Sequence, residues 1–162
     1  MDLISFPPSS RVWIYGGNKL IADEYILDIN DEIADFTKSW SSHGIPIKAT
    51  GALMHNSILI LMADESTQSA SGCSIDTSVQ FIRDIGNRYD VDFFNRMIFH
   101  YLKDNHPRII EARDLPEAVQ KGEISESTLF FDNLVDTKKK FQEEWIKSLK
   151  DSRHKRFVWL FN

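Results

Sequence analysis

Hydrophobic and polar positions in the first part of the chain follow two periodicities in turn, which predict strands and amphipathic helices. A compact β-prone run at Arg11–Tyr15, closed by Gly16-Gly17-Asn18, predicts a strand that ends in a turn. Between Ile26 and Trp40, apolar residues recur at spacings of three and four with acidic residues between them, which is typical of a helix with one buried face. Gly44 is a natural stop for that helix.

Two extended runs and a second helix follow. Lys48–Met54 and Ser57–Ala63 are separated by His55-Asn56 and predict a β-hairpin. Its second strand is apolar on both faces, so we expect it at the centre of a sheet. A polar segment, Glu65–Gly72, leads into a helix, and Arg96–Leu102 predicts a further strand. The inward-facing residues of the second helix are predicted to be Ile75, Val79, Ile82 and Ile85.

The resulting order, β-α-β-β-α-β, matches the ferredoxin-like arrangement. We therefore expect an α+β fold in which one antiparallel sheet carries both helices on one face. The pattern indicates a single domain over residues 1–162, with the α+β core over 1–105 and a helical C-terminal extension over 106–162 packed on it.

Within the extension, short apolar runs alternate with charged segments. Ile109-Ile110 predicts a short strand, and Leu115–Lys121 predicts a short helix that ends at Gly122. Asp136–Leu149 predicts a charged helix, followed by the apolar tail Phe157–Phe161.

Composition narrows the class of protein. Of the 162 residues, 42% are hydrophobic, enough for an ordinary globular core. The formal net charge of −5 argues against a nucleic-acid partner, which usually requires a basic surface. The longest apolar run, Ile58–Ala63, is too short to cross a bilayer, and no signal peptide is apparent, so we expect a cytoplasmic protein without a membrane partner.

The segment Asp64–Asp76 joins the predicted central strand to the second helix and carries the chain's only cysteine, Cys73. The first turn of a helix offers unpaired N–H groups and a partial positive charge, so it attracts anions and favours the thiolate form of a nearby cysteine. The residues predicted to bind an anionic ligand here are Ser71, Gly72, Ser74 and Asp76. The alternative is structural: Ser74 caps the helix, Gly72 permits the turn, and Cys73 packs as a small hydrophobic side chain.

The same segment does not form a phosphate-binding loop of the Walker type. That motif, G-x-x-x-x-G-K-[ST], needs a lysine that reaches the terminal phosphates. Here Gly72 is followed by Cys73-Ser74. We therefore reject nucleotide hydrolysis through that mechanism.

Three residues outside the second helix are further candidates. His43 is a candidate base or anion ligand, or else it interacts with the end of the first helix. Asp64 ends the predicted central strand, where catalytic carboxylates often lie, or it begins a solvated loop. Arg96 either binds an anion or forms an ion pair within the fold. The five histidines lack H-x-x-x-H and H-E-x-x-H spacing, so we predict no metal and no cofactor.

Several segments resemble those of a family of small uncharacterised bacterial proteins. They are Val12–Tyr15, Trp40–Gly44, Ser71–Asp76 (SGCSID), Asn133–Val135, Trp145 and His154–Arg156. The resemblance covers nearly the whole chain and implies a cytoplasmic bacterial protein, without implying an activity. Members often carry the automatic label "ABC transporter ATPase", which the missing Walker signature does not support. Asn95-Arg96 stands where the family has Asp-Arg, which weakens any role for a carboxylate at position 95.

Two hypotheses follow. We favour a non-catalytic binding or interaction protein that holds a small anion at Asp64–Asp76 or recognises a protein partner, because no base lies near Cys73 in the sequence. The alternative is a cysteine-dependent enzyme with Cys73 as nucleophile, His43 or His154 as base, and helix N–H groups stabilising an oxyanion. The apolar tail Phe157–Phe161 would either close the core or pair two chains as a homodimer.

Overall fold

The computed structural model of the protein describes residues 1–160. Its helices and strands are β1 (Arg11–Gly16), α1 (Asp23–Ser39), β2 (Ser41–Ser42), β3 (Ile45–Pro46), β4 (Lys48–Met54), β5 (Ile58–Asp64), α2 (Gly72–Tyr89), β6 (Ile98–Lys103), β7 (His106–Glu111), α3 (Leu115–Gln120), β8 (Leu129–Phe131), α4 (Lys138–Glu144), β9 (Ile146–Ser148) and α5 (Phe157–Leu160). The strands form antiparallel sheets of three, two and four strands. The fold is therefore mixed α and β.

β5 is the central strand of the first sheet, whose order is β1-β5-β4. All seven of its residues are buried, as expected for a strand that is packed on both faces. β4 and β5 pair across the turn formed by His55 and Asn56, whose φ angles are 51° and 58°. Positive φ at both turn residues suits the right-handed twist of a hairpin. The predicted hairpin and its central second strand are confirmed.

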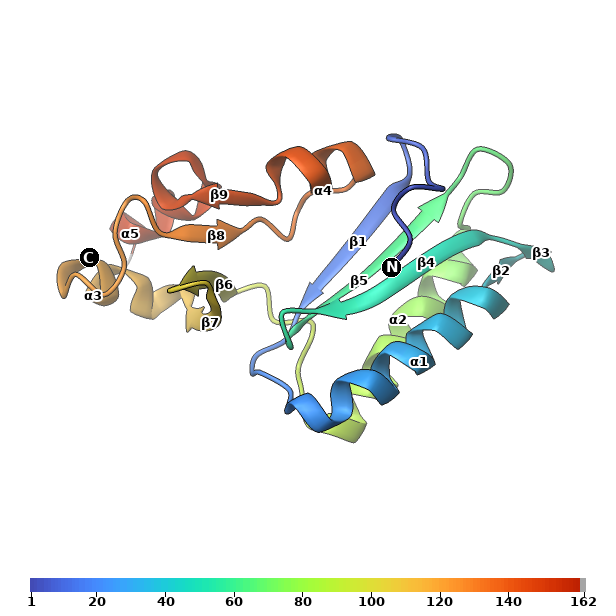
Figure 1. The fold of residues 1–162 in the computed structure, drawn as a ribbon, viewed down its shortest axis with the longest axis horizontal. Helices are drawn as coiled ribbons and strands as arrows, with labels where there is room; N and C mark the ends of the chain where they lie inside the picture. Colours follow the sequence, from blue (N-terminus) through green and yellow to red (C-terminus); the bar gives the residue numbers. More distant parts are fainter. Residues whose placement is uncertain (161–162) are drawn as a thin grey trace.

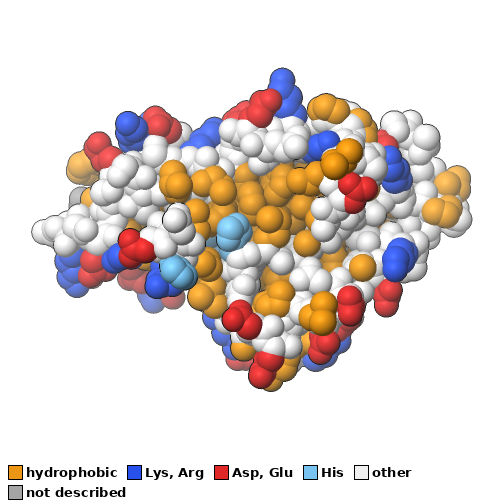
Figure 2. Space-filling model, in the orientation of Figure 1, with side chains coloured by type: hydrophobic (Ala, Val, Ile, Leu, Met, Phe, Trp, Pro, Cys, Tyr) orange, Lys and Arg blue, Asp and Glu red, His pale blue; other side chains and the backbone are white. Residues whose placement is uncertain are grey.

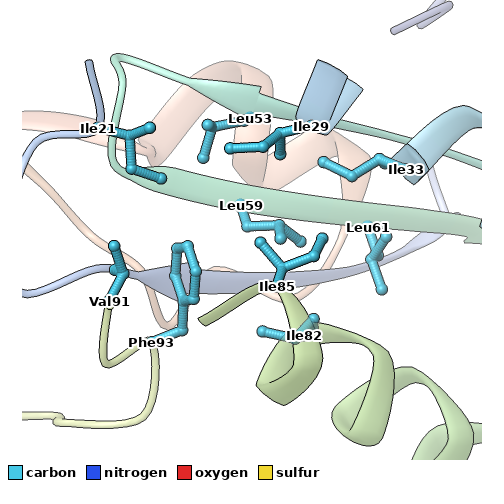
Figure 3. Packing of buried hydrophobic residues seen from close by; sticks show 10 residues of the cluster. All are labelled: Ile21, Ile29, Ile33, Leu53, Leu59, Leu61, Ile82, Ile85, Val91 and Phe93. Atoms are coloured by element: carbon cyan, nitrogen blue, oxygen red, sulfur yellow. The ribbon is translucent and has the colours of Figure 1, made fainter. Parts of the chain in front are cut away.

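α1 and α2 cover one face of the first sheet (Figure 1). Figure 3 shows how their apolar side chains meet those of β5 and of the segment after α2. Ile29 and Ile33 of α1, together with Ile82 and Ile85 of α2, are fully buried in this layer. Burying such a side chain contributes about 1.5–3 kcal/mol, so this layer supplies much of the stability of this half of the molecule.

The opposite face of the first sheet is covered by the N-terminal and C-terminal segments. Ile60 and Met62 of β5 pack against Phe131, Phe141 and Trp145. On the face drawn in Figure 2, hydrophobic side chains gather in a central hollow, and charged side chains lie mainly around its rim. The C-terminal part of the chain thus completes the core of the first sheet.

The four-stranded sheet, called the second sheet below, has the order β7-β6-β8-β9. Its presence corrects the predicted single-sheet ferredoxin-like core. In that arrangement the last strand of β-α-β-β-α-β lies beside the first, so β6 would pair with β1. Instead β6 pairs with β7 across a tight turn at Asp104 and Asn105, whose φ angles are 52° and 60°. β7 and β8 pair with the two edges of β6, so β6 does not pair with the outer edge of β1.

The C-terminal extension is less helical than predicted. The expected helix over Asp136–Leu149 is wrong, because α4 ends at Glu144 and β9 follows at once. Ile146 lies opposite Phe131 in the second sheet, while Trp145 is buried against the first sheet. The pairing of Ile146 and the burial of Trp145 favour an extended chain here, where the sequence pattern predicted a helix.

Candidate functional site

The predicted loop at Asp64–Asp76 is hydrogen-bonded largely to itself. Ser71 caps α2, because its Oγ accepts a hydrogen bond from the N–H of Ser74 at 3.3 Å. The Ser74 hydroxyl donates back to the Ser71 carbonyl at 2.9 Å. Trp40 Nε1 donates to the Ser74 carbonyl at 2.8 Å and ties the start of α2 to the end of α1. The cap is therefore Ser71 and not Ser74 as predicted, and Ser74 is buried.

Cys73 and His43 are exposed, and no hydrogen bond between them is found within residues 1–160. Cys73 lies in the first turn of α2, which Gly72 begins, and Asp76 is exposed further along the same helix. His43 lies in the turn between β2 and β3 with a φ of 53°. A catalytic role for Cys73 and His43, and an anion site at Ser71–Asp76, remain predictions.

Asp64 ends β5, as predicted, and it holds the start of the loop in place. Its carboxylate accepts a hydrogen bond from the Ser66 N–H at 3.1 Å and lies 3.3 Å from Lys48 Nζ. The side chain is only 10% exposed. The hydrogen bonds from Ser66, with the nearby Lys48 ammonium, hold the pKa of Asp64 below its ordinary value. Asp64 is thus an ionised structural carboxylate at neutral pH, which makes it a weak base.

A cavity of about 330 Å³ lies along the outer edge of β1. Its walls come from four segments that are far apart in the sequence: β1 itself, residues 93–99, residues 131–136, and Arg153-His154. Arg96 and the candidate base His154 line this cavity, whereas the predicted site residues of the loop and His43 do not. The cavity therefore lies apart from Ser71–Asp76, the segment that was predicted to bind an anion.

The backbone of β1 is only partly paired on its cavity side. In an antiparallel pair, alternate residues point their N–H and C=O groups to the same edge. The N–H of Val12 points away from β5 and donates to the Asp136 carbonyl at 2.9 Å. Ile14 and Gly16 therefore point to the same outer edge, and their N–H groups have no hydrogen-bond partner within residues 1–160. Both residues line the cavity.

His100 lies beneath the end of β1 and explains why position 16 is a glycine. Its Nε2 lies 2.9 Å from the Gly17 carbonyl, and since a carbonyl only accepts, Nε2 carries the proton. A Cβ at Gly16 would lie 2.9 Å from His100 Nδ1 and 2.8 Å from Asn133 Nδ2. Burial lowers the pKa of His100 to about 4, so the ring is neutral at pH 7.

His154 lines the cavity and is 1% exposed. Its ring packs against Phe99 and Phe130, with centroid distances of 4.5 and 5.1 Å. Burial, with a smaller contribution from the Arg153 guanidinium, lowers the pKa of His154 to about 4. Its Nδ1 has no hydrogen-bond partner among the residues that the structure describes. A buried polar atom without a partner is rare and is often found where a ligand or a water binds.

The charges around the cavity leave one cation unpaired. Arg153 Nε lies 2.9 Å from Asp132 Oδ1, and Asp136 Oδ1 lies 2.9 Å from Lys140 Nζ. Arg96 is exposed and forms no ion pair with any of residues 1–160. The cavity therefore combines an apolar wall with one available guanidinium, which suits an anionic group on an apolar ligand.

The structure places part of the apolar tail. Phe157 is buried against Phe99, with ring centroids 4.8 Å apart, while Trp159 is 75% exposed. The rest of the tail, from the Leu160 side chain onward, lies outside the described residues. Within residues 1–160, no group of three His, Cys, Asp or Glu side chains is arranged to hold a metal ion. None of the helices in this range has the length and apolar composition needed to span a bilayer.

Comparison with protein-family models, with curated proteins and with solved structures finds no match to this chain. Some of the segments that resemble the bacterial family line the cavity, whereas Trp40–Gly44, Ser71–Asp76 and Trp145 do not. Val12–Tyr15, Asn133–Val135 and His154 all line it, as do Asn95 and Arg96.

Proposed function

We propose that the protein is a non-catalytic binding protein whose ligand, an apolar molecule with an anionic group, occupies the cavity beside β1. The observation that carries the proposal is that two residues lining the cavity, His154 and Ile14, carry polar groups without hydrogen-bond partners among residues 1–160. Among residues 1–160, His154 Nδ1 is buried without a hydrogen-bond partner, and the N–H of Ile14 has none either. Buried polar groups normally find partners within the fold, so groups left open on a concave surface favour a ligand.

The size and lining of the cavity support the same proposal. Small-molecule sites have volumes from about 300 Å³ and are mostly apolar, with a few convergent polar groups. Here Phe93, Phe99 and Phe131 contribute buried apolar surface, and Arg96 contributes the charge. Hydrogen bonds to charged groups contribute about 1.5–3 kcal/mol, so Arg96 would account for a large share of the affinity for an acid.

The test uses 4-phenylbutyrate as the anionic probe and 4-phenylbutyramide as its uncharged counterpart, titrated by NMR. We expect the acid to bind more tightly than the amide, and Arg96→Ala to weaken acid binding about tenfold. Arg108→Ala is the matched control, because Arg108 is an exposed arginine of β7 outside the cavity. Equal binding of acid and amide, or equal effects of the two substitutions, would refute an anion site at Arg96.

A cysteine-dependent enzyme is the second candidate, which the exposure of Cys73 in the first turn of α2 favours. Alkylation of Cys73 with iodoacetamide tests whether the loop that carries this cysteine takes part in ligand binding. If the ligand binds beside β1, the alkylated protein binds 4-phenylbutyrate with unchanged affinity. Loss of binding on alkylation would move the site to the loop at Asp64–Asp76.

A further inference from the structure

The outer edge of β1 already accepts a strand-like partner from its own chain. Arg11 and Thr137 form an isolated antiparallel bridge, with the Val12 N–H donating to Asp136 at 2.9 Å and the Lys138 N–H donating to Ser10 at 2.8 Å. Beyond Asp136 in the direction of Asn133, no further pairing with β1 is found among the described residues. The edge is thus paired at its beginning and open at Ile14 and Gly16.

An open strand edge presents N–H and C=O groups at the spacing of a peptide main chain. Many recognition domains bind an extended peptide in this way, with main-chain hydrogen bonds for affinity and pockets for side chains. Open edges are usually blocked by charges, prolines or a covering segment. In this chain a covering segment protects only Arg11 and Val12, and a concave apolar wall lies beside the remainder.

We infer that the ligand of this cavity is the extended C-terminal end of a peptide, whose main chain pairs with β1 at Ile14 and whose terminal carboxylate binds Arg96. The inference rests on the proposed function and names the ligand class for the same site. Continuity with the bridge at Arg11 and Thr137 supports the strand pairing. The guanidinium of Arg96, which forms no ion pair with any of residues 1–160, complements the carboxylate.

The chemistry of the walls predicts which peptides bind. The buried rings of Phe93, Phe99 and Phe131 favour an apolar terminal side chain. His154 is neutral and therefore adds no second positive charge, so its ring favours a polar, uncharged group of the peptide over a second carboxylate. Peptides that end in an aspartate or glutamate are accordingly expected to bind more weakly.

The experiment compares the blocked tetrapeptide acetyl-alanyl-valyl-alanyl-phenylalanine with versions N-methylated at one residue each. Changing the peptide leaves the protein intact, so folding does not complicate the result. Only alternate residues of a paired strand direct their N–H toward the partner. We expect methylation at those residues to weaken binding about tenfold and methylation at the residues between them to change it less than about twofold.

Two further arms separate this inference from the proposed function. Amidation of the terminal carboxylate and Arg96→Ala should each weaken the tetrapeptide about tenfold. If N-methylation has the same small effect at every position while 4-phenylbutyrate still depends on Arg96, the peptide inference is overturned and the proposed function stands. If neither the tetrapeptide nor 4-phenylbutyrate binds, the peptide inference and the proposed function are both refuted. A dimer in sedimentation that does not bind the peptide would show that a second copy of the chain occupies the edge, which also overturns the inference.

Discussion

The loop at Asp64–Asp76 and the cavity beside β1 are both rich in polar groups, but only the loop satisfies its own. In the loop, Ser71 and Ser74 bond to each other, and Asp64 is held by Ser66 and Lys48. In the cavity, the N–H of Ile14 and the Nδ1 of His154 have no partner within residues 1–160. The loop has the polar composition of a binding site, but its polar groups bond to one another. The cavity has polar groups that are still free to bond a ligand.

The difference follows from how each region is assembled. Serine and aspartate near a helix start readily bond to the neighbouring backbone, so a polar loop of this kind tends to close on itself. The cavity is formed by segments that reach one another only through the tertiary fold. Because β6 pairs with β7 and β8, the edge of β1 stays open, and the chain covers only its beginning.

The largest expected effect is on stability and contrasts two glycines, one in each region. Gly16→Ala places a Cβ against His100 and Asn133, which we expect to cost about 3 kcal/mol of unfolding free energy. Gly72→Ala meets nothing within 4 Å and should change stability by less than about 0.5 kcal/mol. Urea unfolding of both variants measures the contrast. Equal stability of the two would contradict the tight packing at the end of β1.

The next effect is the pH dependence of stability. His154 has a folded pKa of about 4 against the ordinary 6.5, so the unfolded chain takes up a proton first as the pH falls. The free energy of unfolding therefore falls as the pH drops from 6.5 to 4. Between pH 7 and 4.5, this histidine accounts for a loss of about 2 kcal/mol. His154→Leu should remove that part of the loss in urea unfolding at the two pH values.

Asp64→Asn is the control for the pH experiment. Its lowered pKa means that the stability from the ionised carboxylate is present above the ordinary value of 3.8 and is lost only as the pH falls through the folded pKa. The change in stability between pH 7 and 4.5 should thus be the same in this variant as in the wild type. A steeper or shallower change would show that the loop contributes to the transition assigned to the buried imidazoles.

The smallest expected effect concerns the role of Ser71. As an N-cap it should contribute about 1 kcal/mol, which Ser71→Ala removes. Ser69→Ala, at an exposed position of the same loop, should leave the unfolding free energy within about 0.5 kcal/mol of the wild type. Neither substitution should alter binding of 4-phenylbutyrate. A loss of binding with unchanged stability in Ser71→Ala would make Ser71 a ligand contact instead of a cap.

The elements of the first sheet were predictable because their signals are local. The apolar run of β5, the turn at His55-Asn56 and the apolar stripe of α1 each lie within one short stretch of sequence. The pairing of β6 with β7 was not predicted, because Asp104-Asn105 was not recognised as a hairpin turn and a single sheet was assumed.

The candidate site was predictable only in part. Arg96 was singled out as an anion ligand or an ion-pair partner, but no local pattern relates residue 96 to Ile14, Asn133 or His154. His100, which lies within β6 at 1% exposure, was not recognised as a neighbour of the end of β1. The open edge of β1 could not be predicted, because it depends on tertiary contacts between segments that are far apart in the sequence.

The most direct test of the central claim is a map of amide chemical-shift changes on addition of 4-phenylbutyrate to the labelled protein. We expect the largest changes at the N–H groups of Ile14 and Gly16 and at the Asn133 side-chain amide. We also expect little change over Gly72–Asp76. The largest changes at Gly72–Asp76, with Ile14 and Gly16 unaffected, would contradict this expectation and place the site in the loop.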